Sequence, residues 1–511
     1  MNANQTSLHQ PNRLVLPALS LCLVATLSAC GGGSDISTAD ATPTPSSVML
    51  AAASHAATVE AQPAFHRMPV AASEPSNTDS DGRGMSAYHA PDLVRTPSEF
   101  SGLSTRGLTD EGAEKYRSER RSQTPSSGSG GVGTPAATST TSVVYTPAQI
   151  RAAYNLASTS GATAANLGAG QTIYIVDAYN HPNVVKDLNT FSTKFGLPTC
   201  TQVAISTGST SLPAASKTSC AISVLYSTSS GAMTSTAPAY NAGWAEEIAL
   251  DTQWAHAIAP LARIVLIEAG SASLTALDGA IILANKFGAG AVSMSFAAAE
   301  GSWVNQSTYS TSLFSTNGMS YFAATGDAGT AVNWPAVVPT VVGVGGTSLS
   351  YTSSSRSEKT WSGTGGGISA YVAMPTYQTG LKIPGEPSMP KRAAGDVAMD
   401  ADPYTGVYVA FTAPTATQTS WYAFGGTSLA TPMWAAAVTV ANANRAVYGY
   451  GTLSAPHTRL YPLVSTSDFY DITLGANGTC ISCYASAGYD TPTGLGSLLA
   501  SNLLAYLSNN P

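Results

Sequence analysis

Apolar runs of strand length alternate with helical runs over residues 142–511, and this alternation restricts the fold more than any other feature of the chain. Strands that alternate with helices form a mostly parallel sheet with helices on both faces, so we expect an α/β fold. The expected strands are 172–176, 264–267, 291–295, 321–324 and 340–344, and the expected helices are 146–154, 245–257, 274–287 and the run after Ser428.

The carboxyl ends of these strands indicate where a functional site would lie, because open parallel sheets bind ligands there. Asp177 directly follows the first expected strand, and Asp327 comes shortly after another. Both carboxyl groups are therefore candidates for chemistry.

A serine stands at the start of the last expected helix, in the sequence Gly426-Thr427-Ser428. Glycine lets a substrate backbone come close, and a helix N-terminus favours the negative charge that develops on a nucleophile. Ser428 is therefore the candidate nucleophile. The same five letters, Gly-Gly-Thr-Ser-Leu, occur at 345–349, where we expect a strand end and a loop, so Ser348 is expected to be structural.

A base for this serine is harder to find, because none of the seven histidines lies in the His-Gly-Thr context of a Ser-His-Asp enzyme. Glu247 and Asp251 are four residues apart on an apolar helix, so their carboxyl groups share a face. Burial and like charge raise carboxyl pKa values, and a pair that shares a proton can serve as a base in mild acid. The alternative is a solvated helix face. His256 lies on the opposite side of the helix, and we expect it to be packed.

Several motifs together resemble the sedolisins, serine-carboxyl peptidases with a subtilisin-like fold. The resemblance runs from about residue 144 to residue 496 and rests on 145–155, the acid pair with 257–260, 325–329 with 334–336, 361–367, 396–403 and 426–428. It implies that Ser428 attacks a peptide carbonyl, that Glu247 takes its proton, and that Asp251 orients Glu247. Asp327 looks like the donor to the oxyanion, and Asp177 has a secondary role.

The C-terminal region resembles the calcium loop of the same family. The resemblance implies one structural Ca²⁺, held by the side chains of Asp471 and Asp490 and by the carbonyl oxygens of Ile472, Ser486 and Gly488. Carboxylate and carbonyl oxygens are the ligands that this hard cation prefers. Without the resemblance, the two aspartates would be interpreted as turn residues.

The N-terminal third differs in character from the rest. Residues 1–30 resemble a bacterial lipoprotein signal that ends in Cys30, and the alternative is an ordinary signal peptide that contains this cysteine. We expect residues 31–141 to be a low-complexity tether with a Gly/Ser linker at 126–133. A charged segment at 92–121, with a helix capped by Thr109, is a candidate pro-segment, although it does not resemble the family's large pro-domain.

The cysteines point to an oxidising compartment. When Cys22 and Cys30 are set aside, four cysteines remain, and an even number suggests disulfides in an exported chain. Their proximity in the sequence predicts the pairs Cys200–Cys220 and Cys480–Cys483. A redox-active or metal-binding role for the Cys-x-x-Cys pair is the alternative, but no second such pair and no thioredoxin-like context supports it.

Composition is consistent with export. Only 10% of the residues are charged, against about 25% in typical proteins, and the net charge of -7 argues against a nucleic-acid binder. We expect a monomeric, acid-active endopeptidase that acts on protein or peptide substrates, either anchored to the bacterial outer membrane through lipidated Cys30 or secreted. The alternative is a catalytically weak, sedolisin-like surface binding module, because Phe296 stands where the family commonly has tryptophan. The sequence leaves the cleavage specificity open.

Overall fold

The computed structural model describes residues 58–75, 90–123, 139–352 and 355–510. The expected signal at 1–30, the lipidation site at Cys30 and the linker at 126–133 lie outside these residues. Among the described residues, no helix is both long enough and apolar enough to cross a membrane.

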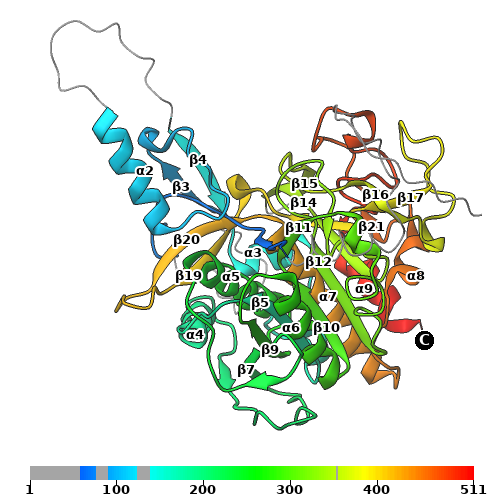
Figure 1. Ribbon diagram of the computed structural model, residues 1–511, viewed down its shortest axis with the longest axis horizontal. Coiled ribbons are helices and arrows are strands. Elements are labelled where there is room, and N and C mark those ends of the chain that lie inside the picture. The colour runs from blue at the N-terminus through cyan, green and yellow to red at the C-terminus, as the bar shows by residue number, and fades with distance from the viewer. Residues whose placement is uncertain (1–57, 76–89, 124–138, 353–354, 511) are drawn as a thin grey trace, which may run out of the picture. The chain divides into compact units, whose positions relative to one another are not determined.

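A large sheet forms the centre of this part of the chain (Figure 1). β5 (Thr172–Ala178) pairs in parallel with β9 (Arg263–Ala269) on one side and with β10 (Gly290–Met294) on the other. The parallel order continues beyond β9 through β7 (Cys220–Ser227), and beyond β10 through β12 (Met319–Ala324), β14 (Val341–Thr352) and β18 (Val397–Asp400). The expected parallel sheet is confirmed.

Helices cover both faces of this sheet. α5 (Ala242–Ile258) and α7 (Thr427–Val447) pack together on the face that carries Ile173 of β5. α6 (Leu274–Phe287) packs on the opposite face, which carries the next residue, Tyr174. Successive side chains of a strand point to opposite faces, so one apolar strand contributes to both cores. The predicted α/β architecture is therefore confirmed.

The repeated Gly-Gly-Thr-Ser-Leu sequence adopts two different structures. The first copy lies inside β14, which continues to Thr352 and pairs with β15 (Ser355–Thr360), so the expected strand end at 345–349 was wrong. Ser348 donates a hydrogen bond from Oγ to Oδ2 of Asp402 at 2.5 Å, which fits a structural role. The second copy ends β20 (Ser420–Gly425) and begins α7, as predicted for Ser428.

Residues 58–75 correct one expectation, because they do not behave as part of a tether. β1 (Gln62–Pro63) pairs antiparallel with β11 (Phe296–Ala299), and β2 (His66–Arg67) pairs antiparallel with β20. The composition of this segment predicts no strand, and the pairing arises because distant strands offer free edges.

The charged segment forms the expected helix. α2 (Asp110–Gln123) begins after Thr109, whose Oγ1 accepts a hydrogen bond from the backbone nitrogen of Gly112 at 3.2 Å. β3 (Asp92–Thr96) precedes α2 and pairs antiparallel with β4 (Thr140–Val144), which leads into the α/β region.

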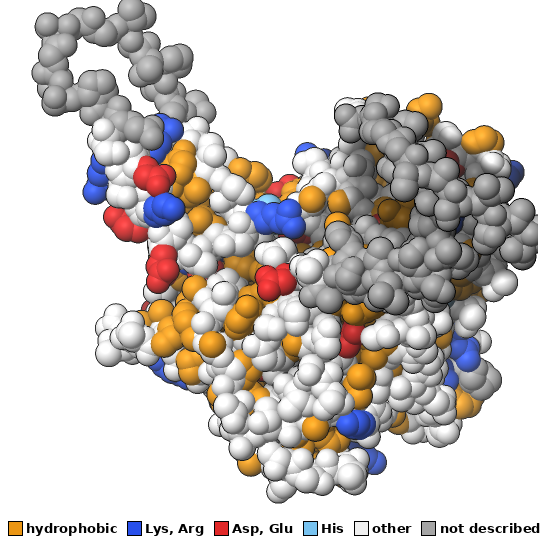
Figure 2. All heavy atoms as spheres, in the orientation of Figure 1, with side chains coloured by type: hydrophobic (Ala, Val, Ile, Leu, Met, Phe, Trp, Pro, Cys, Tyr) orange, Lys and Arg blue, Asp and Glu red, His pale blue; other side chains and the backbone are white. Residues whose placement is uncertain are grey.

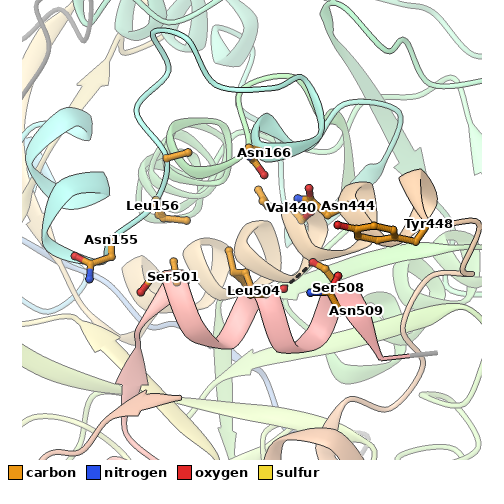
Figure 3. Close-up of a pocket in the computed structure, with 13 residues that line it drawn as sticks. Asn155, Leu156, Asn166, Val440, Asn444, Tyr448, Ser501, Leu504, Ser508 and Asn509 are labelled. Carbon is orange, nitrogen blue, oxygen red and sulfur yellow. Dashed lines mark hydrogen bonds between the residues drawn. The ribbon is translucent and has the colours of Figure 1, made fainter. Parts of the chain in front are cut away.

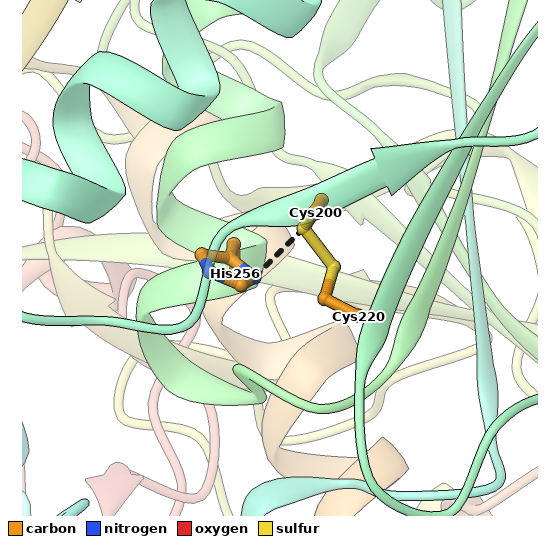
Figure 4. A group of neighbouring side chains, drawn as sticks. All are labelled: Cys200, Cys220 and His256. Carbon is orange, nitrogen blue, oxygen red and sulfur yellow. Dashed lines mark hydrogen bonds between the residues drawn. A yellow bond between two sulfur atoms is a disulfide. The ribbon is translucent and has the colours of Figure 1, made fainter.

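Both predicted disulfides are present, Cys200–Cys220 and Cys480–Cys483. Figure 4 shows His256 beside the first of them, with Nδ1 3.5 Å from Sγ of Cys200. The Nε2 atom of His256 donates to the carbonyl of Pro198 at 2.7 Å, so this histidine is packed, as expected. His256 and the two cysteines lie close enough to hold a metal ion, but the disulfide leaves no thiolate to bind one.

The sheet and its helices bury carboxyl groups without cation partners. Burial raises the pKa of Asp177, Glu268 and Asp278 to about 8 in each case. Asp396 behaves in the opposite way, because the guanidinium of Arg392 overcomes the effect of burial and lowers its pKa. Desolvation favours the neutral acid unless a cation lies beside it.

These raised values predict a protein that is more stable in acid than near neutrality. A carboxyl whose pKa is raised on folding stabilises the fold fully below its unfolded pKa of about 4, and this contribution is lost as pH rises through about 8. The opposite contribution of Asp396 changes only below about pH 4. We expect the free energy of unfolding to fall by about 2 kcal/mol or more between pH 4 and pH 8. Urea denaturation at both pH values measures this change, and equal or greater stability at pH 8 would contradict it.

Candidate active site

α5 and α7 bring the candidate nucleophile and the candidate base together. The side chain of Asn241 caps α5 by accepting from the backbone nitrogen of Trp244, and the helix is so completely covered that Glu247 and Asp251 are fully buried. Ser428 lies in the first turn of α7 and donates from Oγ to Oε2 of Glu247 at 2.9 Å. The serine and the first acid of the predicted pair are therefore in direct contact.

Buried carboxyl groups surround this hydrogen bond. Burial raises the pKa of Glu247 well above its usual value, and the nearby Asp251 and Asp177 raise it further. Burial and Asp177 also raise the pKa of Asp251. Adjacent negative charges repel strongly in a dry site, so in mild acid these groups hold protons between them. The full burial excludes the alternative of a solvated helix face.

Hydrogen bonds fix one carboxyl oxygen of Asp327, and the other carboxyl oxygen makes none to the described residues. Its Oδ1 accepts from Thr427, from the backbone nitrogen at 2.9 Å and from Oγ1 at 2.6 Å. Its Oδ2 makes no hydrogen bond to the described residues. Burial raises the pKa of Asp327 to about 7, against the hydrogen bonds from Thr427 that lower it. In mild acid this carboxyl is therefore protonated and able to donate a hydrogen bond.

The carbonyl group of Ala64, which belongs to the N-terminal segment of the same chain, lies beside Ser428. The backbone nitrogen of Ala64 donates to the carbonyl of Ser295 at 3.2 Å, and the backbone nitrogen of Ser428 donates to the carbonyl of Ala64 at 2.9 Å. Together with the pairing of β1 and β2, these bonds hold residues 62–67 in an extended conformation across the site. The carbonyl group of the Ala64–Phe65 peptide bond is therefore held by the backbone of Ser428, the candidate nucleophile.

Gly426 makes this approach possible. A Cβ atom on Gly426 would lie 2.3 Å from the carbonyl oxygen of Ala64 and 2.7 Å from Oδ2 of Asp327. Its φ of +107° is also one that residues with a side chain rarely adopt. The same contacts show that the Ala64 carbonyl oxygen and the free oxygen of Asp327 lie on the same side of Gly426.

His66 was expected in the N-terminal tail, but the structure places it at the site. Its Nε2 lies 3.5 Å from Oδ2 of Asp327, and its ring meets Trp361 edge-on at 5.2 Å. Burial, together with the charge of Arg106, lowers the pKa of His66 to about 3, so the ring is neutral. Ser428 donates its hydrogen bond to Glu247, the candidate base, and makes none to this ring.

The predicted calcium residues lie in one loop region. The backbone nitrogen of Gly488 donates to Oδ2 of Asp471 at 3.0 Å, and that of Ser486 donates to Oδ2 of Asp490 at 3.0 Å. Ile472 follows Asp471 and is buried. Burial raises the pKa of Asp490 to about 7, and the negative charge of Asp471 contributes to the rise. A cation beside these two acids would relieve this cost, so the residues fit Ca²⁺.

Surface features add little to the chemistry of the site. Figure 2 shows mainly uncharged side chains on the face it presents, as expected for a chain with 10% charged residues. The pocket in Figure 3 lies between α7 and α9 (Ala500–Asn509). Amide, hydroxyl and apolar side chains line this pocket, and it includes no carboxyl, histidine or cysteine. A second hollow runs beside Gln62 and Pro63 and is lined by Tyr179 and Trp244.

Sequence reasoning missed the residues that the site takes from residues 58–75. Ala64 has no distinguishing motif, and Arg67 reads as an isolated charge in a low-complexity region. The buried Glu246, next to the candidate base, was also not singled out. Only the short sequence Gln-Pro-Ala-Phe-His-Arg-Met could have served as a signal, because it contains no Ser or Thr in a region where these residues are frequent.

Comparison with known proteins adds independent information. No protein-family model matches the chain. Sedolisin from Pseudomonas sp. (strain 101) is 32% identical over 198 residues, which cover 35% of this chain and 31% of that protein. Xanthomonalisin from Xanthomonas sp. (strain T-22) is 31% identical over 207 residues, which cover 35% of this chain and 23% of that protein. The aligned part thus spans less than a third of either relative.

A solved structure agrees with these matches. Pseudomonas sedolisin, a serine-carboxyl proteinase complexed with two molecules of pseudo-iodotyrostatin, matches with a TM-score of 0.55 and 24% identity. The match covers 72% of this chain and 99% of the other, and at this identity it establishes the fold. The predicted resemblance to the sedolisins is confirmed, and the chain shares the subtilisin-like fold of Pseudomonas sedolisin.

Proposed function

We propose that the chain is a serine-carboxyl peptidase that hydrolyses peptide bonds in mildly acidic water. The observation that carries this proposal is the hydrogen bond from Ser428 to Glu247, formed beside a backbone carbonyl that the amide of Ser428 already holds. Nucleophile, base and substrate-like carbonyl lie together, as a covalent mechanism requires.

The reaction follows from this geometry. Oγ of Ser428 attacks the carbonyl carbon while its proton passes to Glu247, and the oxygen becomes an oxyanion. The backbone N–H of Ser428 and the protonated Oδ2 of Asp327 stabilise that charge. Glu247 then gives the proton to the leaving amine as the C–N bond breaks. Water hydrolyses the acyl-enzyme by the same steps in reverse order, and Asp251 positions Glu247 throughout.

A carboxyl pair suits this chemistry better than histidine in acid. Imidazole has a pKa of about 6.5 and is protonated there, so it accepts no proton from serine. A buried carboxyl pair that shares one proton keeps a basic oxygen available over that range. The alternative of a surface binding module needs none of these groups, so loss of activity in single variants separates the two functions.

Ser428→Ala and Glu247→Gln should each lower the rate of peptide cleavage by at least about a thousandfold, because nucleophile and base are both required. Ser348→Ala and Glu119→Gln are matched controls, since Ser348 lies in the repeated sequence within β14 and Glu119 is exposed on α2. Hydrolysis of denatured casein at pH 4 measures the effect, with circular dichroism to check folding. Full activity in either site variant would refute the assignment.

The chain should also cut itself between Ala64 and Phe65, since that carbonyl lies on the amide of Ser428. We expect incubation in mild acid to give a fragment with Phe65 at its N-terminus, and Ser428→Ala to give none. Mass spectrometry identifies the new terminus, and a rate that does not change on dilution shows cleavage within one molecule. Cleavage elsewhere, with this bond left intact, would contradict the assignment.

We propose one structural Ca²⁺ at the loop of Asp471 and Asp490, with carbonyl oxygens of Ile472, Ser486 and Gly488. The support is the pair of neighbouring carboxyl groups, one of them buried with a raised pKa. When bound, the ion would tie the loop to the end of the sheet. The step-by-step chemistry at Ser428 does not involve it.

Calcium should raise the melting temperature, because a ligand at a hundred times its dissociation constant stabilises the folded state by about 2.7 kcal/mol. The shift should disappear in Asp471→Asn and persist in Asp468→Asn, a nearby and partly exposed control. Differential scanning fluorimetry with Ca²⁺ and with a chelator at pH 6 measures it. An equal shift in both variants would show that the ion binds elsewhere.

We further propose export and anchoring through Cys30, which the apolar run before it and the two disulfides support. Self-cleavage at Ala64–Phe65 would separate residues 65–511 from that anchor. Mass spectrometry of the material retained on membranes tests both points, because the retained peptide would carry a lipid on Cys30.

A further inference from the structure

Arg67 is fully buried, which is uncommon for a cation, and it lies in a pocket of complementary groups. Its Nη1 donates to Oδ1 of Asp110 at 2.9 Å and lies 3.3 Å from Oε1 of Glu246. Its guanidinium group lies over the ring of Tyr422, 4.2 Å from the centroid. The hydroxyl of Tyr422 donates to both carboxylate oxygens of Asp110 at 2.9 Å, which fixes the pocket.

α5 and β20, the elements that carry or lead into the candidate site residues, build two walls of this pocket. Glu246 precedes Glu247 on α5, so the two side chains point about 100° apart around the helix. One carboxyl therefore faces Ser428 while its neighbour faces Arg67. Tyr422 belongs to β20, the strand that leads into Ser428 (Figure 1). Asp110, at the start of α2, closes the pocket and is 60% exposed.

The position of Arg67 relative to the nucleophile is fixed by backbone pairing. Ala64 supplies the carbonyl held by Ser428, so Arg67 is the third residue after the presented bond. β2 pairs His66 with Gly425 and Arg67 with Phe424, and the backbone nitrogen of Met68 donates to the carbonyl of Ala423. Any peptide that pairs with β20 in this register places its third side chain in the same pocket.

We propose that Glu246 and Tyr422 form a subsite that binds an arginine side chain at the third position after the cleaved bond, and that Arg67 is its occupant within the chain. This proposal rests on the proposed peptidase function and names a substrate class for it: peptides with arginine at that position.

The chemistry of the pocket selects arginine over other side chains. A planar guanidinium group stacks on an aromatic ring and donates several N–H groups in one plane, whereas the lysine ammonium is a compact point charge. Burial raises the pKa of Glu246 to about 8, and the charge of Arg67 opposes that rise. Since a carboxyl offers an acceptor oxygen in either protonation state, the pocket keeps its hydrogen bond in mild acid.

The test uses quenched fluorescent peptides with the sequence of residues 60–70, in which the arginine is kept or replaced by lysine, glutamine or methionine. The chain with Arg67→Ala, which removes the occupant of the pocket, is first incubated in acid and then assayed for kcat/KM on each peptide. We expect a preference for arginine over methionine of roughly tenfold, the size of one charge-assisted hydrogen bond. Glu246→Leu should abolish the preference, and Glu246→Gln, which keeps an acceptor oxygen, should retain part of it.

Controls separate a subsite from a structural role. Glu119→Leu replaces an exposed acid of α2 and should leave the preference unchanged. A misfolded variant would lose activity on all peptides equally, whereas a subsite variant changes the ratio between them. Equal cleavage of all peptides by the chain with Arg67→Ala overturns the subsite and leaves the peptidase function standing. Self-cleavage without cleavage of any peptide also overturns it, and no cleavage of chain or peptides refutes the peptidase function itself.

Discussion

The hydrogen bond from Ser428 to Glu247, made inside a cluster of buried acids, is the interaction on which the rest of the site depends. It exists because α5 is covered on all sides and because α7 begins at the end of β20. Burial that would be costly for isolated carboxylates is tolerated in mild acid, where the cluster holds protons. The same burial makes the fold itself prefer acid, so stability and proposed activity share one cause.

Gly426 and backbone pairing show how a peptide can lie against this cluster. Gly426 leaves room for the carbonyl oxygen of Ala64 next to the free oxygen of Asp327. β11 and β20 offer edges on either side of the nucleophile, and residues 62–67 pair with both. Because these contacts use backbone atoms, they accept many sequences, and in the proposed peptidase the selectivity would depend on side-chain pockets such as that of Glu246 and Tyr422.

Helices and caps that depend only on residues close together in the sequence were predicted correctly. α6 spans the expected 274–287, and Thr109 caps α2, because periodicity and capping depend on neighbouring residues. The contact between Ser428 and Glu247 was also predicted, from the resemblance to a known family and from the four-residue spacing of the acid pair. The strands of residues 58–75 were not, because they form only against β11 and β20, far away in the chain. Arg67 was missed for the same reason, since its partners come from α2, α5 and β20.

The pH dependence of kcat/KM for peptide cleavage, measured for the unchanged chain and for Asp327→Asn, tests most directly whether carboxyl groups replace imidazole here. We predict a rise at low pH as the Glu247–Asp251 pair loses its first proton, and a fall through about pH 7 as Asp327 ionises. The amide of Asp327→Asn donates without titrating, so this variant should lose the fall and keep the rise. An activity that instead climbs through pH 6–7 to a plateau in both proteins would show an imidazole base and contradict the account.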